Sequence, residues 1–155
     1  MSDSTTPSRL THLDEASCRQ LLASHDVGRV AINGEPAPEV LPVTYAVRGG
    51  DVIFRTAEGV KQIAAERGIA ATFEVDGVDA DRRSAWSVIA RGHLESADGA
   101  RFDDLPEPLA GGDRPHLVRF VVRELSGRRI RPEEGWARAM TGRSWSGPDA
   151  SDLMG

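Results

Sequence analysis

The sequence predicts a mainly β fold, a small antiparallel barrel with short helices at its margins. Three observations indicate it: six or seven short segments have strand patterns, turn residues separate them, and a single helical segment is inserted after the third strand. The chain therefore lacks the alternating βα units from which doubly wound parallel sheets are built. With 155 residues, 39% of them hydrophobic, it is long enough for one domain with its own core.

The first part of the chain is expected to hold a disordered start, a short helix and a strand. Residues 1–9 are polar and show no period. The segment LDEASCRQLLAS has partly helical spacing, and Asp14 is a plausible N-cap. The single cysteine, Cys18, falls inside this helix, where a small buried side chain is its expected role. A strand over residues 27–33 follows, and NGEPAP predicts a turn.

The middle of the chain predicts a hairpin followed by a second helix. The segment EVLPVTYAV alternates, so one set of side chains is expected to face the core and the other to face outward. The first set is Leu41, Val43, Tyr45 and Val47, and the second is Val40, Pro42, Thr44 and Ala46. Gly49-Gly50 predicts a tight turn into a strand over 51–56. A helix over 58–68 follows, with Val60, Ile63 and Ala64 expected on its buried stripe.

The last part of the chain completes the predicted sheet. Strands are expected over 71–78 and 85–96, a loop over 101–115, and then either two strands or one bent strand over 116–125 and 127–131. The domain is therefore expected to span residues 10–131. Residues 132–155 form a tail with no period and no assigned role, although it contains Trp136 and Trp145.

Composition narrows the function classes. The net charge of −5 argues against a general nucleic-acid binder. No apolar run approaches the roughly 20 residues of a membrane span, and the N-terminal segment lacks the apolar core of a secretory signal. A lone cysteine fits a reducing compartment, so we expect a cytoplasmic protein. No His or Cys spacing is typical of zinc, and we expect no metal site.

The stretch FRTAEGVK contains the only lysine of the chain. Arg55 offers a planar fork, Thr56 a hydroxyl and Lys61 a compact ammonium, next to the expected start of a helix. These donors suit a terminal phosphate, although a solvated surface lysine is the alternative. The pattern GxxxxGK[ST] is absent, so a nucleoside triphosphate is not indicated. Eight arginines between residues 114 and 143 leave a similar choice between a solvated basic surface and one that meets an anionic ligand or an acidic partner.

The order of several motifs resembles a known family. PVTY, a Gly-Gly hairpin, FRTAEGVK, FEVDG, AWSVIARG and SGRRI follow one another over residues 13–131. Together they resemble the FMN-binding split-barrel proteins related to pyridoxamine 5′-phosphate oxidase, and within them the nitroimidazole-reductase-like branch. The resemblance implies a six-stranded antiparallel split β-barrel with short flanking helices. It also implies a homodimer that holds FMN in a groove at the dimer interface.

The resemblance also implies roles for individual residues. The strand that backs the isoalloxazine ring matches Pro42, Val43 and Thr44. The positions that hold the ribityl chain and the phosphate match Arg55, Thr56 and Lys61. The strand beside the ring matches Trp86 and Ser87, and the pair Arg128-Arg129 lies in a segment that can approach the partner's flavin.

The function implied is an FMN-dependent oxidoreductase that acts on a small molecule, with the flavin supplying the chemistry. An F420-dependent reductase on the same fold, a heme-handling relative and a flavin-binding module without turnover are the alternatives. The tail GWARAMTGRSWSG does not match the substrate segment of the vitamin B6 oxidases. Oxidation of vitamin B6 is therefore not implied, and no catalytic acid or base is identified.

Overall fold

The computed structural model describes residues 10–79, 84–108 and 111–131. This part of the chain contains seven strands and two helices. Their bounds are β1 Leu10–Leu13, α1 Glu15–Ala23, β2 Val27–Ile32, β3 Glu39–Arg48, β4 Asp51–Thr56, α2 Val60–Glu66, β5 Ala70–Asp79, β6 Ser84–Ser96 and β7 His116–Ile130. The expected disordered start and the tail with Trp136 and Trp145 lie outside the described residues.

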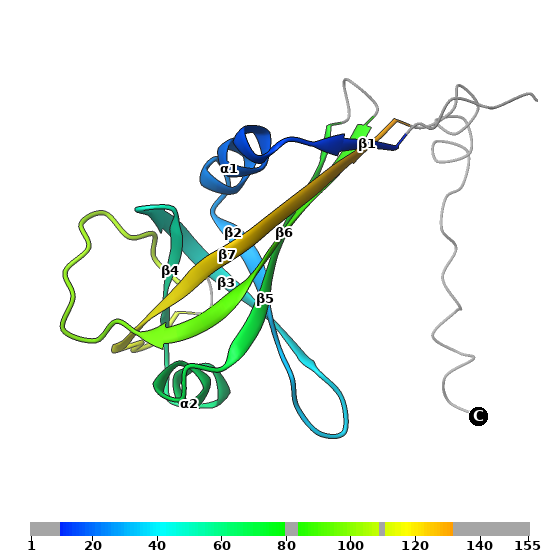
Figure 1. Ribbon diagram of the computed structural model, residues 1–155. Coiled ribbons are helices and arrows are strands. Elements are labelled where there is room, and N and C mark those ends of the chain that lie inside the picture. The colour runs from blue at the N-terminus through cyan, green and yellow to red at the C-terminus, as the bar shows by residue number, and fades with distance from the viewer. Residues whose placement is uncertain (1–9, 80–83, 109–110, 132–155) are drawn as a thin grey trace, which may run out of the picture.

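The strands form one antiparallel sheet in the order β1-β7-β4-β3-β2-β5-β6, and β6 pairs with β7 as well. The second pairing of β7 closes six strands into a ring, and α1 and α2 lie at opposite ends of it (Figure 1). The predicted six-stranded antiparallel barrel is therefore confirmed. The sequence did not predict β1, which pairs with β7 from Leu10 opposite Ile130 to Leu13 opposite Gly127. A strand of four residues has too little pattern to be detected without its partner.

The sequence left open whether the last part of the domain forms two strands or one bent strand, and β7 answers this question. It is one strand of 15 residues. Its pairing with β6 slips between the pairs Arg91–Glu124 and Gly92–Val122, so Arg123 is the extra residue of a β-bulge. A Cβ atom at Gly92 would lie 1.7 Å from the Val121 carbonyl oxygen. Only glycine allows the two backbones to approach this closely.

The core is an aromatic cluster inside the barrel. The rings of Tyr45 and Phe73 meet edge to face at 4.9 Å, and Phe120 lies 5.9 Å beyond Phe73. The Tyr45 hydroxyl donates a hydrogen bond of 2.5 Å to the Leu22 carbonyl oxygen, which ties α1 to the barrel. The alternation predicted for β3 is confirmed, because Tyr45 is buried whereas Val40 on the other face is 60% exposed.

The first helix agrees with its prediction. Asp14 caps α1 by accepting a hydrogen bond of 2.8 Å from the Ser17 backbone N–H. Hydrogen bonding by the Ser17 side chain and backbone lowers the pKa of the Asp14 carboxyl. Cys18 is fully buried, as expected.

The second helix is shorter than predicted, and of the three residues expected on its buried stripe only Ala64 is buried. Ala64 and Ala65 face the barrel, whereas Val60 and Ile63 are 44% and 47% exposed. Small side chains let this short helix lie close to the sheet, and the two large apolar side chains remain outside the contact.

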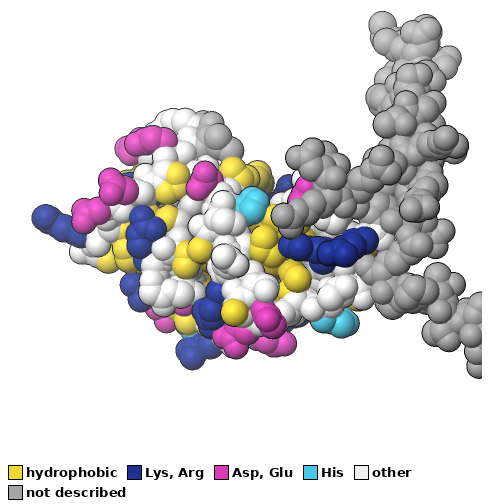
Figure 2. All heavy atoms as spheres, turned by 90° about the horizontal axis from the view of Figure 1, so that it is seen from above, with side chains coloured by type: hydrophobic (Ala, Val, Ile, Leu, Met, Phe, Trp, Pro, Cys, Tyr) yellow, Lys and Arg dark blue, Asp and Glu magenta, His cyan; other side chains and the backbone are white. Residues whose placement is uncertain are grey.

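The surface in Figure 2 carries separate groups of basic and acidic side chains among apolar ones, so no continuous basic surface covers that face. Within the described part of the chain, no helix has the length and apolar character needed to cross a membrane.

Candidate functional site

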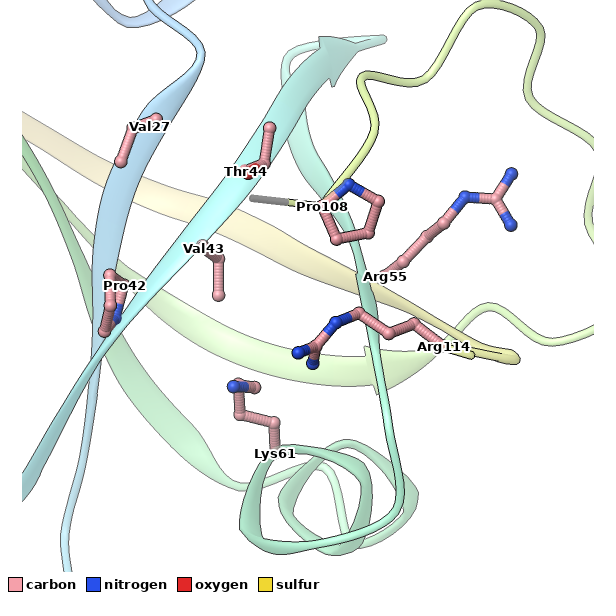
Figure 3. Close-up of a pocket in the computed structure, with 8 residues that line it drawn as sticks. All are labelled: Val27, Pro42, Val43, Thr44, Arg55, Lys61, Pro108 and Arg114. Carbon is pink, nitrogen blue, oxygen red and sulfur yellow. The ribbon is translucent and has the colours of Figure 1, made fainter. Parts of the chain in front are cut away.

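A pocket of about 300 Å³ opens beside β3, between β4, α2 and the loop that precedes β7 (Figure 3). Its lining consists of Val27, Pro42, Val43, Thr44, Arg55, Lys61, Pro108 and Arg114. The structure therefore brings together Pro42, Val43, Thr44, Arg55 and Lys61, which the sequence predicted to act on one cofactor. Val27 and Pro108 were not predicted, and Arg114 was predicted only as one of the eight arginines for which contact with an anionic ligand is one of two alternatives.

The pocket lies where two strands stop pairing. Strands β3 and β4 are paired from Tyr45 opposite Phe54 to Arg48 opposite Asp51, whereas β3 already begins at Glu39. The stretch of β3 around Pro42 therefore has no partner residues on β4. A proline, which cannot donate to a strand ladder, is tolerated there because, among the strands that the structure describes, only β2 pairs with this stretch.

Two cations extend into the pocket from different elements. Lys61 from α2 and Arg114 from the loop point toward each other (Figure 3). The pKa of Lys61 is lowered because burial strips water from its ammonium group and because the charge of Arg114 repels it. Among the described residues no carboxylate forms an ion pair with Lys61 or Arg114. A bound anion would remove this repulsion, so the arrangement favours a negatively charged ligand.

The other predicted phosphate-binding residues lie differently. Arg55 lines the pocket, but its guanidinium points away from Lys61 (Figure 3). Thr56 is 2% exposed, pairs with His116 across β4 and β7, and does not line the pocket. The roles implied for these two residues stay predictions.

A second hollow, of about 260 Å³, lies on the outer face of β5, β6 and β7. Its lining consists of Asp76, Gly77, Val78, Ala85, Trp86, Ser87, Arg128 and Ile130. Trp86 and Ser87 are therefore not beside Lys61 within one chain. The Trp86 ring meets the His25 ring edge to face at 4.6 Å.

Arg129 follows Arg128 but does not line this hollow. It stands opposite Trp86 in the register of β6 and β7. Its Nε atom is buried and, among the described residues, has no hydrogen-bond partner. Its predicted contact with a partner's flavin is not tested by one chain.

An ion-pair cluster separates the pocket from the hollow on the same outer face. Arg29 of β2 donates to Glu74 at 3.0 Å and to Asp76 at 3.4 Å. Arg29 also stands opposite Pro42, which lines the pocket, and Asp76 lines the hollow. Burial and the neighbouring Asp76 raise the pKa of Glu74, although Arg29 opposes this shift.

A closed antiparallel barrel with a pocket at the open edge of one strand defines a split-barrel protein, and the cations in this pocket favour an anionic ligand. Comparison with known proteins agrees with this class. The family model described as pyridoxamine 5′-phosphate oxidase matches residues 14–129. The chain therefore belongs to the pyridoxamine 5′-phosphate oxidase family, as the resemblance of its motifs implied.

Individual relatives are found in several bacteria. An uncharacterised protein of Mycobacterium tuberculosis, Rv0080, is 35% identical over 130 residues, which cover 78% of this chain and 86% of that protein. The solved FAD-binding protein of Mycobacterium smegmatis is 30% identical, with a TM-score of 0.61, and the match covers 79% of this chain and 99% of that one. A protein of Bacteroides thetaiotaomicron described as a 5-nitroimidazole antibiotic resistance protein is 15% identical with a TM-score of 0.51, covering 78% and 89% of the two chains. The last match supports the fold alone.

Proposed function

We propose that this chain binds a flavin nucleotide, FMN in the first instance, with its phosphate at Lys61 and its ring against Pro42, Val43 and Thr44. The observation that carries the proposal is the pair of cations that, among the described residues, form no ion pair with a carboxylate, located where β3 extends past its pairing with β4. Phosphate is the group of the cofactor that such a pair attracts most strongly. Membership of the family and the FAD-binding relative of Mycobacterium smegmatis support a flavin, since FMN and FAD share both the ring and a phosphate.

The proposed activity is oxidation or reduction of a small molecule. A bound flavin supplies the two-electron chemistry, and the chain supplies binding and orientation. The eight residues that line the pocket include no carboxylate or imidazole, so Lys61, whose pKa is lowered, is the only general acid or base that this lining offers. The same observation favours a second candidate, a flavin-binding module without turnover. An F420-dependent reductase is a third, because the additional cation Arg114 suits the more anionic tail of that cofactor.

We further propose a homodimer that forms through the outer face with the pocket and the hollow. On this face Val40 and Val78 are 60% and 78% exposed, so two apolar side chains are available for contact with a partner. The Arg29 cluster lies between the two cavities. A two-fold axis near that cluster would bring the hollow of one protomer, with Trp86 and Ser87, over the pocket of its partner.

The experiment is a titration of FMN and riboflavin against wild type and Lys61→Ala. Charge-assisted hydrogen bonds contribute about 1.5–3 kcal/mol, so the substitution should weaken FMN roughly 10- to 100-fold. Riboflavin, which lacks the phosphate, should lose less than threefold. Arg67→Ala is the matched control, because Arg67 is an exposed cation at the other end of α2. Equal losses for both ligands, or none, would make Lys61 a surface residue. The absorbance of the purified protein separates a flavin from the deazaflavin F420.

A further inference from the structure

We propose that Arg114, rather than Arg55, is the guanidinium that shares the cofactor phosphate with Lys61. The inference rests on the proposed function and extends it to a residue of the loop before β7, which no motif of the family resemblance includes. It also makes this loop part of the cofactor site.

The first argument comes from the directions in which the three cationic side chains point. Lys61 and Arg114 extend toward a common point, whereas Arg55 extends away from it (Figure 3). Two like charges this close repel each other, and both side chains are long enough to turn into water instead. Among the described residues neither group forms an ion pair with a carboxylate. A phosphate between them would be contacted from two sides, by a point charge and by a planar fork.

The second step is that Arg114 is held in place by its own loop. Its Nε–H donates to the Gly111 carbonyl oxygen at 3.2 Å. This bond uses one of the five N–H donors of the guanidinium and leaves the terminal groups for a ligand. Arg114 is therefore oriented before an anion arrives, so less side-chain entropy is lost on binding.

The third step is the anchoring of the chain that follows Arg114. Asp98 accepts a hydrogen bond of 2.7 Å from the Leu117 backbone N–H and contacts His116 Nδ1 at 3.1 Å. Strand β7 then pairs with β4, with His116 opposite Thr56. Pro115, whose ring restricts its own backbone, joins this anchored point to Arg114. The start of β7 is thus fixed beside the end of β4, which is the wall of the pocket.

The first experiment compares Arg114→Gln and Arg55→Gln, with Arg101→Gln as the control, in titrations with FMN, FAD and riboflavin. Arg101 is an exposed arginine of the same loop that does not line the pocket. Arg114→Gln should weaken FMN and FAD by about 10- to 100-fold and riboflavin by less than threefold. Arg55→Gln should weaken FMN and FAD less than Arg114→Gln does, and the control should change the affinity for every ligand by less than threefold. The assignment is overturned if Arg55→Gln costs more than Arg114→Gln, or if Arg114→Gln weakens riboflavin as much as FMN.

The second experiment uses no flavin and separates this inference from the proposed function. Inorganic phosphate should raise the thermal unfolding midpoint of wild type above its value in chloride of equal ionic strength, and Arg114→Gln should abolish the difference. Without ligand, Arg114→Gln should be at least as stable as wild type, because it removes the repulsion on Lys61. A phosphate effect of this kind without flavin binding would refute the proposed function and, with it, the cofactor role of Arg114, and would leave a phosphate site formed by Lys61 and Arg114. Flavin binding that is as tight in Arg114→Gln as in wild type would support the proposed function and refute the role of Arg114.

Discussion

Replacement of Gly28 by alanine is expected to destabilise the barrel and to weaken the cofactor site together. Gly28 lies on β2 opposite Val43. A Cβ atom there would lie 2.3 Å from Phe73 Cζ and 2.9 Å from the Glu74 carbonyl oxygen, whereas ordinary contacts begin near 3.4 Å. The Phe73 ring would have to move by about 1 Å, and it is packed between Tyr45 and Phe120.

Overpacking of this kind costs about 1–3 kcal/mol, and the rigid neighbours of Phe73 place Gly28→Ala near the upper end. For a chain of this length each kcal/mol lowers the unfolding midpoint by about 2–4 °C, so we expect a fall of roughly 5–10 °C. Gly34→Ala in the exposed β2–β3 turn is the control, because its Cβ would meet no atom closer than 3.2 Å.

Urea denaturation of Gly28→Ala, Phe73→Leu and the double variant identifies the cause. A smaller side chain at position 73 leaves room for the added methyl group, so Gly28→Ala should cost at least about 1 kcal/mol less in the Phe73→Leu background. Affinity for FMN should fall in Gly28→Ala and recover in the double variant, because Val27 and Val43 line the pocket. Additive losses would show that Phe73 is not the obstacle and would refute the reasoning.

Two further predictions concern the site and the dimer. Burial and Arg114 lower the pKa of Lys61, and phosphate binds its protonated form, so FMN affinity should fall as the pH rises through that lowered pKa. FMN affinity should also fall below about pH 6 as the phosphate dianion is protonated. In Lys61→Gln the loss of affinity at alkaline pH should be absent. The same pH dependence in Lys61→Gln and wild type would contradict the placement of the phosphate at Lys61. Light scattering of wild type should give twice the chain mass of 16.7 kDa. Val78→Asp should give the monomer and Val60→Asp on α2 should not, whereas a dimeric Val78→Asp variant would exclude this face.

The sequence could predict the barrel because its strands obey simple alternation over enough residues. In β3 the period of two separates Val43 and Tyr45 from Val40. The same method predicted the helix α2 but assigned Val60 and Ile63 wrongly to its buried stripe, since seven residues make fewer than two complete turns and do not define a stripe. It also failed for β1, whose position depends on β7 and not on its own four residues.

The candidate site also has residues that the local sequence predicts and residues whose place depends on long-range pairing. Arg55 and Lys61 could be predicted because one continuous stretch contains both. Arg114 could not, because its place in the pocket follows from the pairing of His116 with Thr56, at the end of a long loop without periodicity. Trp86 and Ser87 were predicted on the same cofactor, yet within one chain they lie in a separate hollow. Only a second protomer could unite the two sets.

The position of the pocket follows from the way in which the barrel is closed. The six strands satisfy one another's backbone groups around the ring, so a ligand that needs main-chain contacts can bind only where pairing stops. In the described part of the chain, β3 extends past the end of its pairing with β4, and the pocket lies at that point. The elements that border it, α2 and the loop before β7, are free to carry cations because neither belongs to the ring. The rigid barrel therefore fixes the wall of the pocket, and its margins supply the charge that we propose selects the ligand.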